Sequence, residues 1–187
     1  MIKLISVGDG GSGKTSLMLA YAENKFPFDY LPTFLDDCVV TVSPAGIPTE
    51  FAMWDTNSSS SYDRMRCLSY HNTNVFLITF SITFPPSLQN VETRWYPELR
   101  RYSPDVCVFL VATKIDLRSD EKTLEKLMSK NWAPVTSEQG ETMAKKLGIR
   151  YFETSALTGQ GVRNLFEAAI AQQPRNLEKR EKKCRVS

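Results

Sequence analysis

The chain has 187 residues, of which 42% are hydrophobic and 24% are charged, with a formal net charge of +2. This composition suits one globular domain whose core needs no disulfides. No run approaches about 18 apolar residues, and the N-terminus lacks a basic and then apolar signal, so the sequence predicts neither a membrane span nor secretion. The four scattered cysteines favour free thiols, and the single histidine, His71, excludes a histidine-based metal site.

The charge is unevenly distributed along the chain. The segment Pro174–Ser187 holds six basic and two acidic residues and so carries +4, which leaves −2 for the rest. A nucleic-acid-binding domain spreads positive charge over its folded surface, so we expect no nucleic-acid partner. The segment also has few apolar residues, and we expect a flexible polybasic tail at 174–187 after a folded domain at 1–173.

The first predicted elements are a strand at Ile2–Val7 and a helix at Thr15–Asn24, and the loop between them reads G-x-x-x-x-G-K-[ST]. In this pattern the glycines let backbone N–H groups face phosphates, Lys14 reaches the β and γ oxygens, and the Thr15 hydroxyl ligates Mg²⁺. The strand–loop–helix order favours this interpretation over a glycine-rich turn with an unrelated lysine. The expected phosphate-binding residues are Gly10, Gly11, Ser12, Gly13, Lys14, Thr15 and Ser16.

Strand-like and helix-like stretches alternate through the rest of the chain. Further strands are predicted at Cys38–Val42, Glu50–Trp54, Val75–Ser81, Val106–Ala112 and Tyr151–Glu153. Further helices are predicted at Pro86–Arg101, Ser137–Leu147 and Gly161–Gln172. The fourth and fifth strands are apolar on both faces, as central parallel strands are, so the alternation predicts an α/β doubly wound sheet.

The second and third strands are separated only by Ser43–Thr49, which is too short for a helical crossover. We therefore expect them to form an antiparallel hairpin. The complete sheet should have six strands, five parallel and one antiparallel, flanked by helices. The charged stretch Ser119–Lys130 has Leu124, Leu127 and Met128 at helical spacing, which favours a short exposed helix over a loop.

Two later segments have groups suited to guanine. In Thr113-Lys114-Ile115-Asp116 the carboxylate accepts the guanine N1–H and N2–H₂ donors, which adenine lacks, while the lysine stem covers the base. Thr154-Ser155-Ala156-Leu157 follows the last strand and places the Ala156 N–H near guanine O6. Each string is weak alone, but their order behind the phosphate loop predicts a guanine-nucleotide site. The expected base-side residues are Thr113, Lys114, Asp116, Leu117, Ser155, Ala156 and Leu157.

In this order the parts resemble the Ras superfamily, and within it the Rho/Rac branch, over nearly the whole chain. The most specific match is the string Tyr62–Tyr70 (Tyr-Asp-Arg-Met-Arg-Cys-Leu-Ser-Tyr), which is similar to Rho switch II and follows Trp54-Asp55-Thr56. Phe26-Pro27 and Tyr30-Leu31-Pro32-Thr33 are similar to switch I. The charged helical stretch at about residues 120–130 resembles the Rho insert helix.

The resemblance implies a P-loop GTPase domain that binds GTP or GDP with Mg²⁺. It implies that Thr15 and Thr33 ligate the metal, that Asp55 holds it through water, and that Lys14 and Thr33 act in hydrolysis. Two aromatic residues are expected at the nucleotide, Tyr30 over the phosphates and Phe26 against the nucleotide itself.

The resemblance also implies partners. Effectors are expected at switch I (Tyr30–Asp36) and switch II (Tyr62–Tyr70), with exchange factors as regulators. The chain is expected to act as a monomer, and its expected output is organisation of the actin cytoskeleton.

The chain departs from the family after Asp55-Thr56, where relatives read Ala-Gly-Gln and this chain reads Asn57-Ser58-Ser59. Ser59 stands at the position of the glutamine that orients the attacking water. Its shorter side chain cannot present both a carbonyl and an amide, and phosphoryl transfer in this class rests on positioning and charge. We therefore expect impaired hydrolysis, intrinsic and accelerated, with binding retained. The Rnd group of Rho relatives also has serine here.

Ser58 replaces the glycine whose backbone N–H meets the γ-phosphate. Serine keeps this N–H but lacks the conformational freedom of glycine. We expect an altered switch II geometry and a smaller contrast between the GTP and GDP states. The alternative is that neighbouring residues absorb the change.

The last four residues, Cys184-Arg185-Val186-Ser187, resemble a C-a-a-X box, and the terminal serine favours a farnesyl group on Cys184 although Arg185 is atypical. One lipid chain contributes about 5 kcal/mol of membrane binding, and a tail charge of +4 adds about 4 kcal/mol on an anionic leaflet. Together they predict anchoring at the cytoplasmic face of the plasma membrane. The alternative is an unmodified, solvated tail.

The sequence thus predicts an atypical Rho-type GTP-binding protein that stays loaded with GTP. One alternative is a working GTPase switch that uses the serine hydroxyl, or a glutamine from a partner, in place of the missing group. Another is a scaffold whose surface is the same with either nucleotide or with none. Asp116 disfavours a kinase or another P-loop ATPase.

Overall fold

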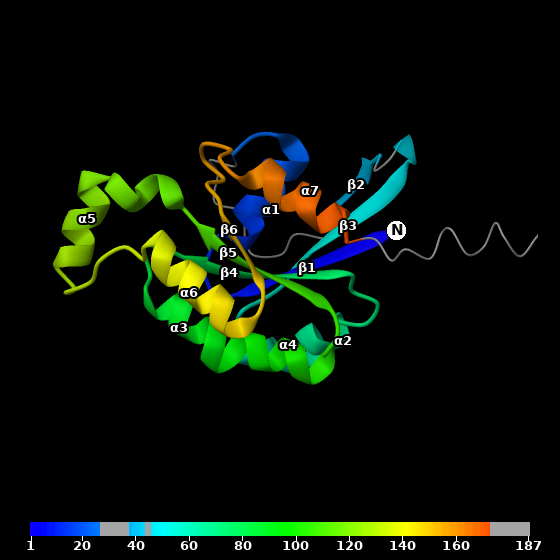
Figure 1. Ribbon diagram of the computed structural model, residues 1–187, viewed down its shortest axis with the longest axis horizontal. Helices are drawn as coiled ribbons and strands as arrows, with labels where there is room; N and C mark the ends of the chain where they lie inside the picture. Colours follow the sequence, from blue (N-terminus) through cyan, green and yellow to red (C-terminus); the bar gives the residue numbers. More distant parts are fainter. Residues whose placement is uncertain (27–37, 44–45, 173–187) are drawn as a thin grey trace, which may run out of the picture.

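The computed structural model describes residues 1–26, 38–43 and 46–172, and its centre is a six-stranded sheet in the order β2-β3-β1-β4-β5-β6 (Figure 1). The strands are β1 (Ile2–Gly8), β2 (Cys38–Val42), β3 (Thr49–Asp55), β4 (Val75–Ser81), β5 (Cys107–Thr113) and β6 (Arg150–Glu153). β2 and β3 pair antiparallel, while all other neighbours are parallel. The predicted mixed sheet and its hairpin are confirmed.

The parallel register brings the ends of distant strands to one edge of the sheet. Ser6 of β1 lies beside both Asp55 of β3 and Leu77 of β4, and Ala112 of β5 lies beside Glu153 of β6. In an open α/β sheet, ligands bind in the crevice outside these carboxyl ends. The loops after β1, β3, β5 and β6 therefore meet at the same edge.

Helices cover both faces of the sheet. In Figure 1, α1 (Lys14–Glu23) and α7 (Val162–Ile170) lie on one face, and α2 (Asp63–Leu68), α3 (Pro86–Asn90), α4 (Tyr96–Tyr102) and α6 (Ser137–Leu147) lie on the other. Side chains of β4 alternate between the two cores: Val75 and Leu77 pack with α1 and α7, whereas Phe76 and Ile78 pack with α4 and α6. This alternation explains why β4 is apolar at every position.

The helix predicted at Pro86–Arg101 is interrupted. It consists of α3 (Pro86–Asn90), a π-helical turn η3 (Val91–Trp95) and α4 (Tyr96–Tyr102). The Tyr96 N–H donates to the Val91 carbonyl, five residues back. Pro97 follows in the helix interior, where it has no N–H and its ring crowds the preceding turn. The wider π-helical turn accommodates the proline ring and its missing N–H. The spacing of apolar residues alone does not predict this turn.

Two short helical elements follow β3, the 3₁₀ turn η2 (Ser60–Tyr62) and α2, and the sequence prediction missed both. The helix predicted within Ser119–Lys130 is present as α5 (Glu121–Met128), after the 3₁₀ turn η4 (Ile115–Ser119). The Asp120 side chain caps α5 by accepting the Thr123 N–H.

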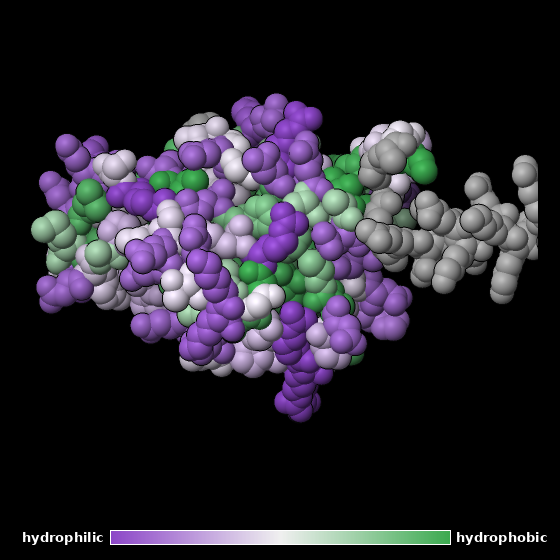
Figure 2. All heavy atoms as spheres, in the orientation of Figure 1, coloured by the Kyte–Doolittle hydropathy of each residue, from purple (hydrophilic) through white to green (hydrophobic). Residues whose placement is uncertain are grey.

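No helix in the described part of the chain has the length and hydrophobicity needed to span a bilayer. Hydrophilic side chains cover most of the face drawn in Figure 2, and hydrophobic residues show in small areas between them. This surface is ordinary for a domain whose apolar residues are used in two internal cores.

Candidate nucleotide-binding site

The loop after β1 has the geometry of a phosphate-binding loop. Gly13 has a φ of +90°, in the left-handed region that glycine adopts readily, and it begins α1. Lys14 is 4% exposed, and its Nζ donates to the carbonyl oxygens of Gly8 at 3.0 Å and Asp9 at 2.9 Å. The ammonium is therefore held inside the curl of the loop, close to where phosphate oxygens bind at a helix N-terminus.

Burial lowers the pKa of Lys14 to about 8, against the opposing charges of Asp55 and Asp9. Because burial disfavours the charged ammonium, an anion beside it would stabilise the charged form. A phosphate group in the loop would therefore stabilise the charged form of Lys14.

Two of the residues expected to hold Mg²⁺, Thr15 and Asp55, lie together. The Thr15 hydroxyl donates to Oδ2 of Asp55, while Oδ1 of Asp55 accepts the Thr56 N–H at 3.0 Å. Burial raises the pKa of Asp55, and the bond from Thr15 and the charge of Lys14 oppose this. A hydroxyl and a carboxylate are oxygen ligands of the kind that Mg²⁺ takes alongside water and substrate phosphates. These residues therefore fit the ion, which would neutralise phosphate charge when bound.

A pocket of about 170 Å³ lies beside the phosphate loop at the ends of β5 and β6. Its walls come from Gly13, Ser16, Leu17, Phe26, Thr113, Lys114, Asp116, Leu117, Thr154, Ala156 and Leu157. Nine of these were predicted from the sequence, whereas Leu17 and Thr154 were not. The pocket thus joins the two proposed base-reading segments to the first turn of α1.

Hydrogen bonds fix the segments that form this pocket. Nζ of Lys114 donates to the Gly11 carbonyl at 2.8 Å, which joins the base side to the phosphate loop. Burial lowers the pKa of Lys114, and Asp116 opposes this. Arg118 makes two hydrogen bonds to the Glu153 carboxylate, at 3.2 and 2.7 Å, and so ties η4 to the end of β6.

Ser155 is the predicted base-side residue that does not line the pocket. It is fully buried, and its hydroxyl accepts the Thr158 N–H at 3.1 Å while its N–H donates to the Gln160 carbonyl at 2.9 Å. Ser155 therefore shapes the loop that presents Ala156 and Leu157.

The segment after β3 lies against the phosphate loop. A Cβ on Gly10 would be 3.2 Å from the Ser58 Oγ, which places Ser58 next to the loop. Among the described residues, the non-glycine residues with positive φ are Asn24, Asn72, Lys114 and Asn131. Ser58 is therefore free of left-handed backbone strain in this conformation.

The exposed Ser59 makes its bonds within the same segment. Its N–H donates to Oδ1 of Asn57 at 2.8 Å, and its hydroxyl shares a hydrogen bond of 2.7 Å with the Ser61 hydroxyl. Its side chain thus interacts with its neighbours in the sequence.

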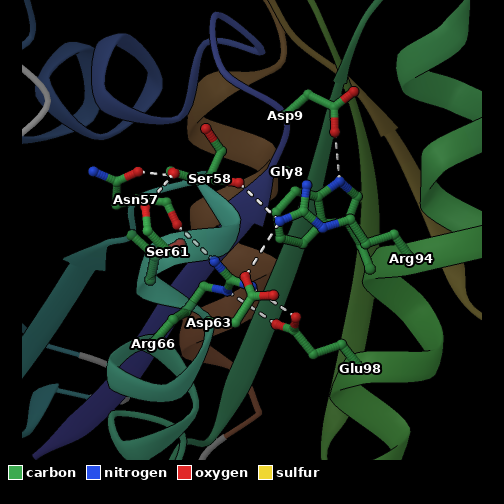
Figure 3. Close-up of polar contacts among 12 residues, drawn as sticks. Gly8, Asp9, Asn57, Ser58, Ser61, Asp63, Arg66, Arg94 and Glu98 are labelled. Atoms are coloured by element: carbon green, nitrogen blue, oxygen red, sulfur yellow. Dashed lines mark hydrogen bonds and ion pairs between the residues drawn. The ribbon is translucent and has the colours of Figure 1, made fainter.

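Arg66 of α2 connects this segment to α4. Its side chain is 1% exposed and forms an ion pair with Glu98 at 2.7 Å, and its Nη1 donates to the Asn57 carbonyl at 2.8 Å (Figure 3). Burial opposes the charge of Arg66, but the hydrogen bonds that it donates to the Glu98 and Asp63 carboxylates outweigh burial and raise its pKa. The predicted string Tyr62–Tyr70 included Arg66 but not this role.

Three predicted site residues, Tyr30, Thr33 and Cys184, lie outside the described residues, as does the predicted tail. Three residues that hold the phosphate side, Asn90, Arg94 and Trp95, were not predicted. Asn90 and Trp95 donate to the Asp9 carboxylate at 2.7 and 2.8 Å, and Arg94 donates to the Ser58 carbonyl at 2.9 Å. No local motif marks these contacts, because they join residues far apart in the chain.

The phosphate loop, the Thr15–Asp55 pair and the pocket beside Asp116 occur in one order along one sheet edge. A family model described as "Ras family" matches residues 3–175, which is most of the chain. The chain therefore belongs to the Ras family, whose members are small GTP-binding proteins.

Proposed function

We propose that this chain is a Rho-type small GTP-binding protein that keeps its bound GTP because it hydrolyses it slowly. The proposal is carried by one observation: Lys14, Thr15 and Asp55 supply phosphate and metal groups in the described part of the site, whereas Ser59 occupies the position that the resemblance assigns to water orientation. Binding and hydrolysis depend on different groups, so loss of the water-positioning group impairs hydrolysis and leaves binding intact.

The surroundings of Ser59 support slow hydrolysis. The hydroxyl is engaged with Ser61, and the backbone N–H is engaged with Asn57. Neither group replaces the paired carbonyl and amide of a glutamine. An arginine finger from an accelerating protein is worth about 10³–10⁵ in rate, and we infer that much of this gain is also lost.

The Rho/Rac assignment is supported by two features. The switch II string Tyr62–Tyr70 matches that branch closely, and the helix α5 lies where the Rho insert helix is expected. We accordingly propose effectors that bind switch I and switch II, exchange factors as activators, and an output to the actin cytoskeleton. These partners rest on the resemblance.

We also propose that the basic tail and a lipid on Cys184 anchor the protein to the cytoplasmic face of the plasma membrane. Charge and lipid are each marginal as anchors and sufficient together. Mass spectrometry of the protein from its native cell tests this proposal. An intact, unlipidated C-terminus would contradict it.

Slow hydrolysis is tested by following the bound nucleotide. Purified protein is loaded with GTP and Mg²⁺, excess nucleotide is removed, and the bound fraction is analysed by HPLC over several hours. We expect GTP to persist, with guanine preferred over adenine in competition. Release of phosphate within minutes, or a preference for ATP, would overturn the proposal.

A second candidate, a scaffold with the same surface in both nucleotide states, is favoured by the arginine contacts to the Asn57 and Ser58 carbonyls. Both contacts join protein groups to one another. Effector affinity measured with GDP and with a non-hydrolysable GTP analogue separates the two: equal affinities support the scaffold, and unequal ones exclude it.

A further inference from the structure

Two arginines hold the peptide groups on either side of Ser58. Nη1 of Arg66 donates to the Asn57 carbonyl at 2.8 Å, and Nη2 of Arg94 donates to the Ser58 carbonyl at 2.9 Å (Figure 3). The next N–H, that of Ser59, is fixed by Oδ1 of Asn57 at 2.8 Å. Both peptide planes that flank the Ser58 Cα therefore have partners.

These contacts determine where the Ser58 N–H points. A trans peptide is planar, with its carbonyl and N–H on opposite sides, so a carbonyl held by Arg66 turns the Ser58 N–H away from Arg66. The φ and ψ angles of Ser58 set the angle between its two planes, and Arg94 holds the second plane. The side chains of Arg66 and Arg94 thus restrict the backbone conformation of Ser58.

Arg94 comes from the same helical stretch that holds the phosphate loop. Asn90, Arg94 and Trp95 lie in or next to the π-helical turn, and Asn90 and Trp95 donate to the Asp9 carboxylate. The Arg94 guanidinium lies 4.3 Å from the centroid of the Trp95 ring, a contact that orients it. A wider turn at this point is common near functional sites. Contacts from one helical stretch therefore fix the position of Ser58 relative to the phosphate loop.

The contact between these two parts is close. A Cβ on Gly10 would be 3.2 Å from the Ser58 Oγ. Movement of Ser58 therefore changes the space next to Gly10 of the phosphate loop.

We propose that Arg94 is a positioning residue for the γ-phosphate: it holds the peptide that follows Ser58, and together with Arg66 on the preceding peptide it limits how far the Ser58 N–H can turn from the terminal phosphate of GTP. This inference rests on the proposed function and on the expectation, from the resemblance, that the Ser58 N–H meets that phosphate. Because GDP has no such phosphate, Arg94 distinguishes triphosphate from diphosphate without touching either.

Arg94 is the residue to test, since Arg66 is buried among Asp63, Tyr70 and Glu98 and its loss endangers the fold. The side chain of Arg94 is 36% exposed, so its truncation leaves no large cavity. Arg94→Lys serves as the conservative variant, because lysine keeps the charge and one donor. Arg101→Ala is the matched control: Arg101 is exposed on α4 and contacts the Tyr102 ring.

The experiment measures dissociation of fluorescent mant-GDP and of mant-GppNHp, a non-hydrolysable GTP analogue, from the full chain. For Arg94→Ala we expect the analogue to leave about five- to tenfold faster, and GDP to change less than about twofold. Arg94→Lys should recover part of the difference, and Arg101→Ala should match wild type.

Equal acceleration of both nucleotides by Arg94→Ala would show a general structural role and overturn the proposal, and so would unchanged release of the analogue. If Arg94→Ala does not fold, the same two rates for Arg94→Lys decide, since a selective change is still expected. The analogue is not hydrolysed, so the result is independent of whether the wild-type protein hydrolyses GTP slowly.

Discussion

The proposed base side and the proposed γ-phosphate side of the site, hereafter the base side and the γ-phosphate side, are built in different ways. Around the base, loops that directly continue β5 and β6 are joined by short backbone bonds, such as Thr154 N–H to Ala112 carbonyl at 2.8 Å. Around Ser58, the backbone is held by arginine side chains from α2 and η3, with Arg94 bridging 36 residues. The base side thus depends mainly on the sheet, with Lys114 and Arg118 as additional side-chain links, whereas the γ-phosphate side depends on side chains that substitution can remove.

The largest expected effect comes from removing Asp116, the carboxylate that we expect to read the base. Asp116→Ala should lower GDP affinity by about 10²–10⁴-fold, because two charge-assisted hydrogen bonds of about 1.5–3 kcal/mol each are lost. Competition against mant-GDP measures it. The control is Glu121→Ala, an exposed carboxylate on α5. A loss of GDP affinity below about threefold would mean that another group reads the base. It would contradict the assignment of Asp116 to the base side.

The next effect is a gain of activity on the γ-phosphate side. Ser59→Gln should raise single-turnover hydrolysis of GTP by about 10²-fold, the scale of a lost or restored positioning group, while GDP affinity stays the same. A phosphate-release assay measures it, and Ser60→Gln, at the adjacent exposed serine, is the control. Equal rates for wild type and Ser59→Gln would show that hydrolysis is limited elsewhere.

The difference between local contacts on the base side and long-range contacts around Ser58 also explains what could be predicted from the sequence. The sheet, its hairpin and the base-side residues follow from local patterns: Asp116 comes directly after an apolar strand, and strand ends of a parallel sheet meet at one edge. Such inferences need only the order of the elements.

The γ-phosphate side was predicted less completely, because its contacts are long-range. Nothing near Arg94 or Trp95 in the sequence indicates that they reach Ser58 and Asp9, which depends on the π-helical turn. Helical spacing also missed α2, a short helix whose main anchor, Arg66, is a buried charge. Charged residues in short segments look exposed until their partners are known.

A smaller effect is expected when the support of the base side is weakened. Arg118→Ala removes a partly exposed bidentate pair with Glu153 and should speed release of GDP and of the GTP analogue alike, by about fivefold. Mant-nucleotide dissociation measures both rates. Arg163→Ala, which breaks the exposed pair with Glu167 on α7, should change neither. A selective effect on the analogue would contradict the division between the two sides.

The smallest effect concerns the protonation of Lys14. We expect this residue to contact phosphate groups that GDP and GTP share. Burial, opposed by Asp55 and Asp9, lowers the pKa of Lys14 to about 8 in the nucleotide-free protein, and a neighbouring phosphate raises it again. Binding therefore takes up a proton when the pH is above about 8, so GDP affinity falls as the pH rises through this value. Between about pH 7 and 8.5 the charged fraction of free Lys14 falls about fourfold, and GDP affinity should fall by the same factor.

Calorimetry at about pH 8, in two buffers with different ionisation enthalpies, measures this proton directly. About half a proton should be taken up for each GDP bound, because half of the free Lys14 is neutral at its pKa. The phosphate of GDP contributes little in this window, since its second ionisation lies near pH 6. Uptake that grows from about pH 7 to 8.5 supports the charged lysine as the shared phosphate contact. Release of a proton, or no exchange at all, would mean that Lys14 stays neutral beside the phosphate or is already charged without it.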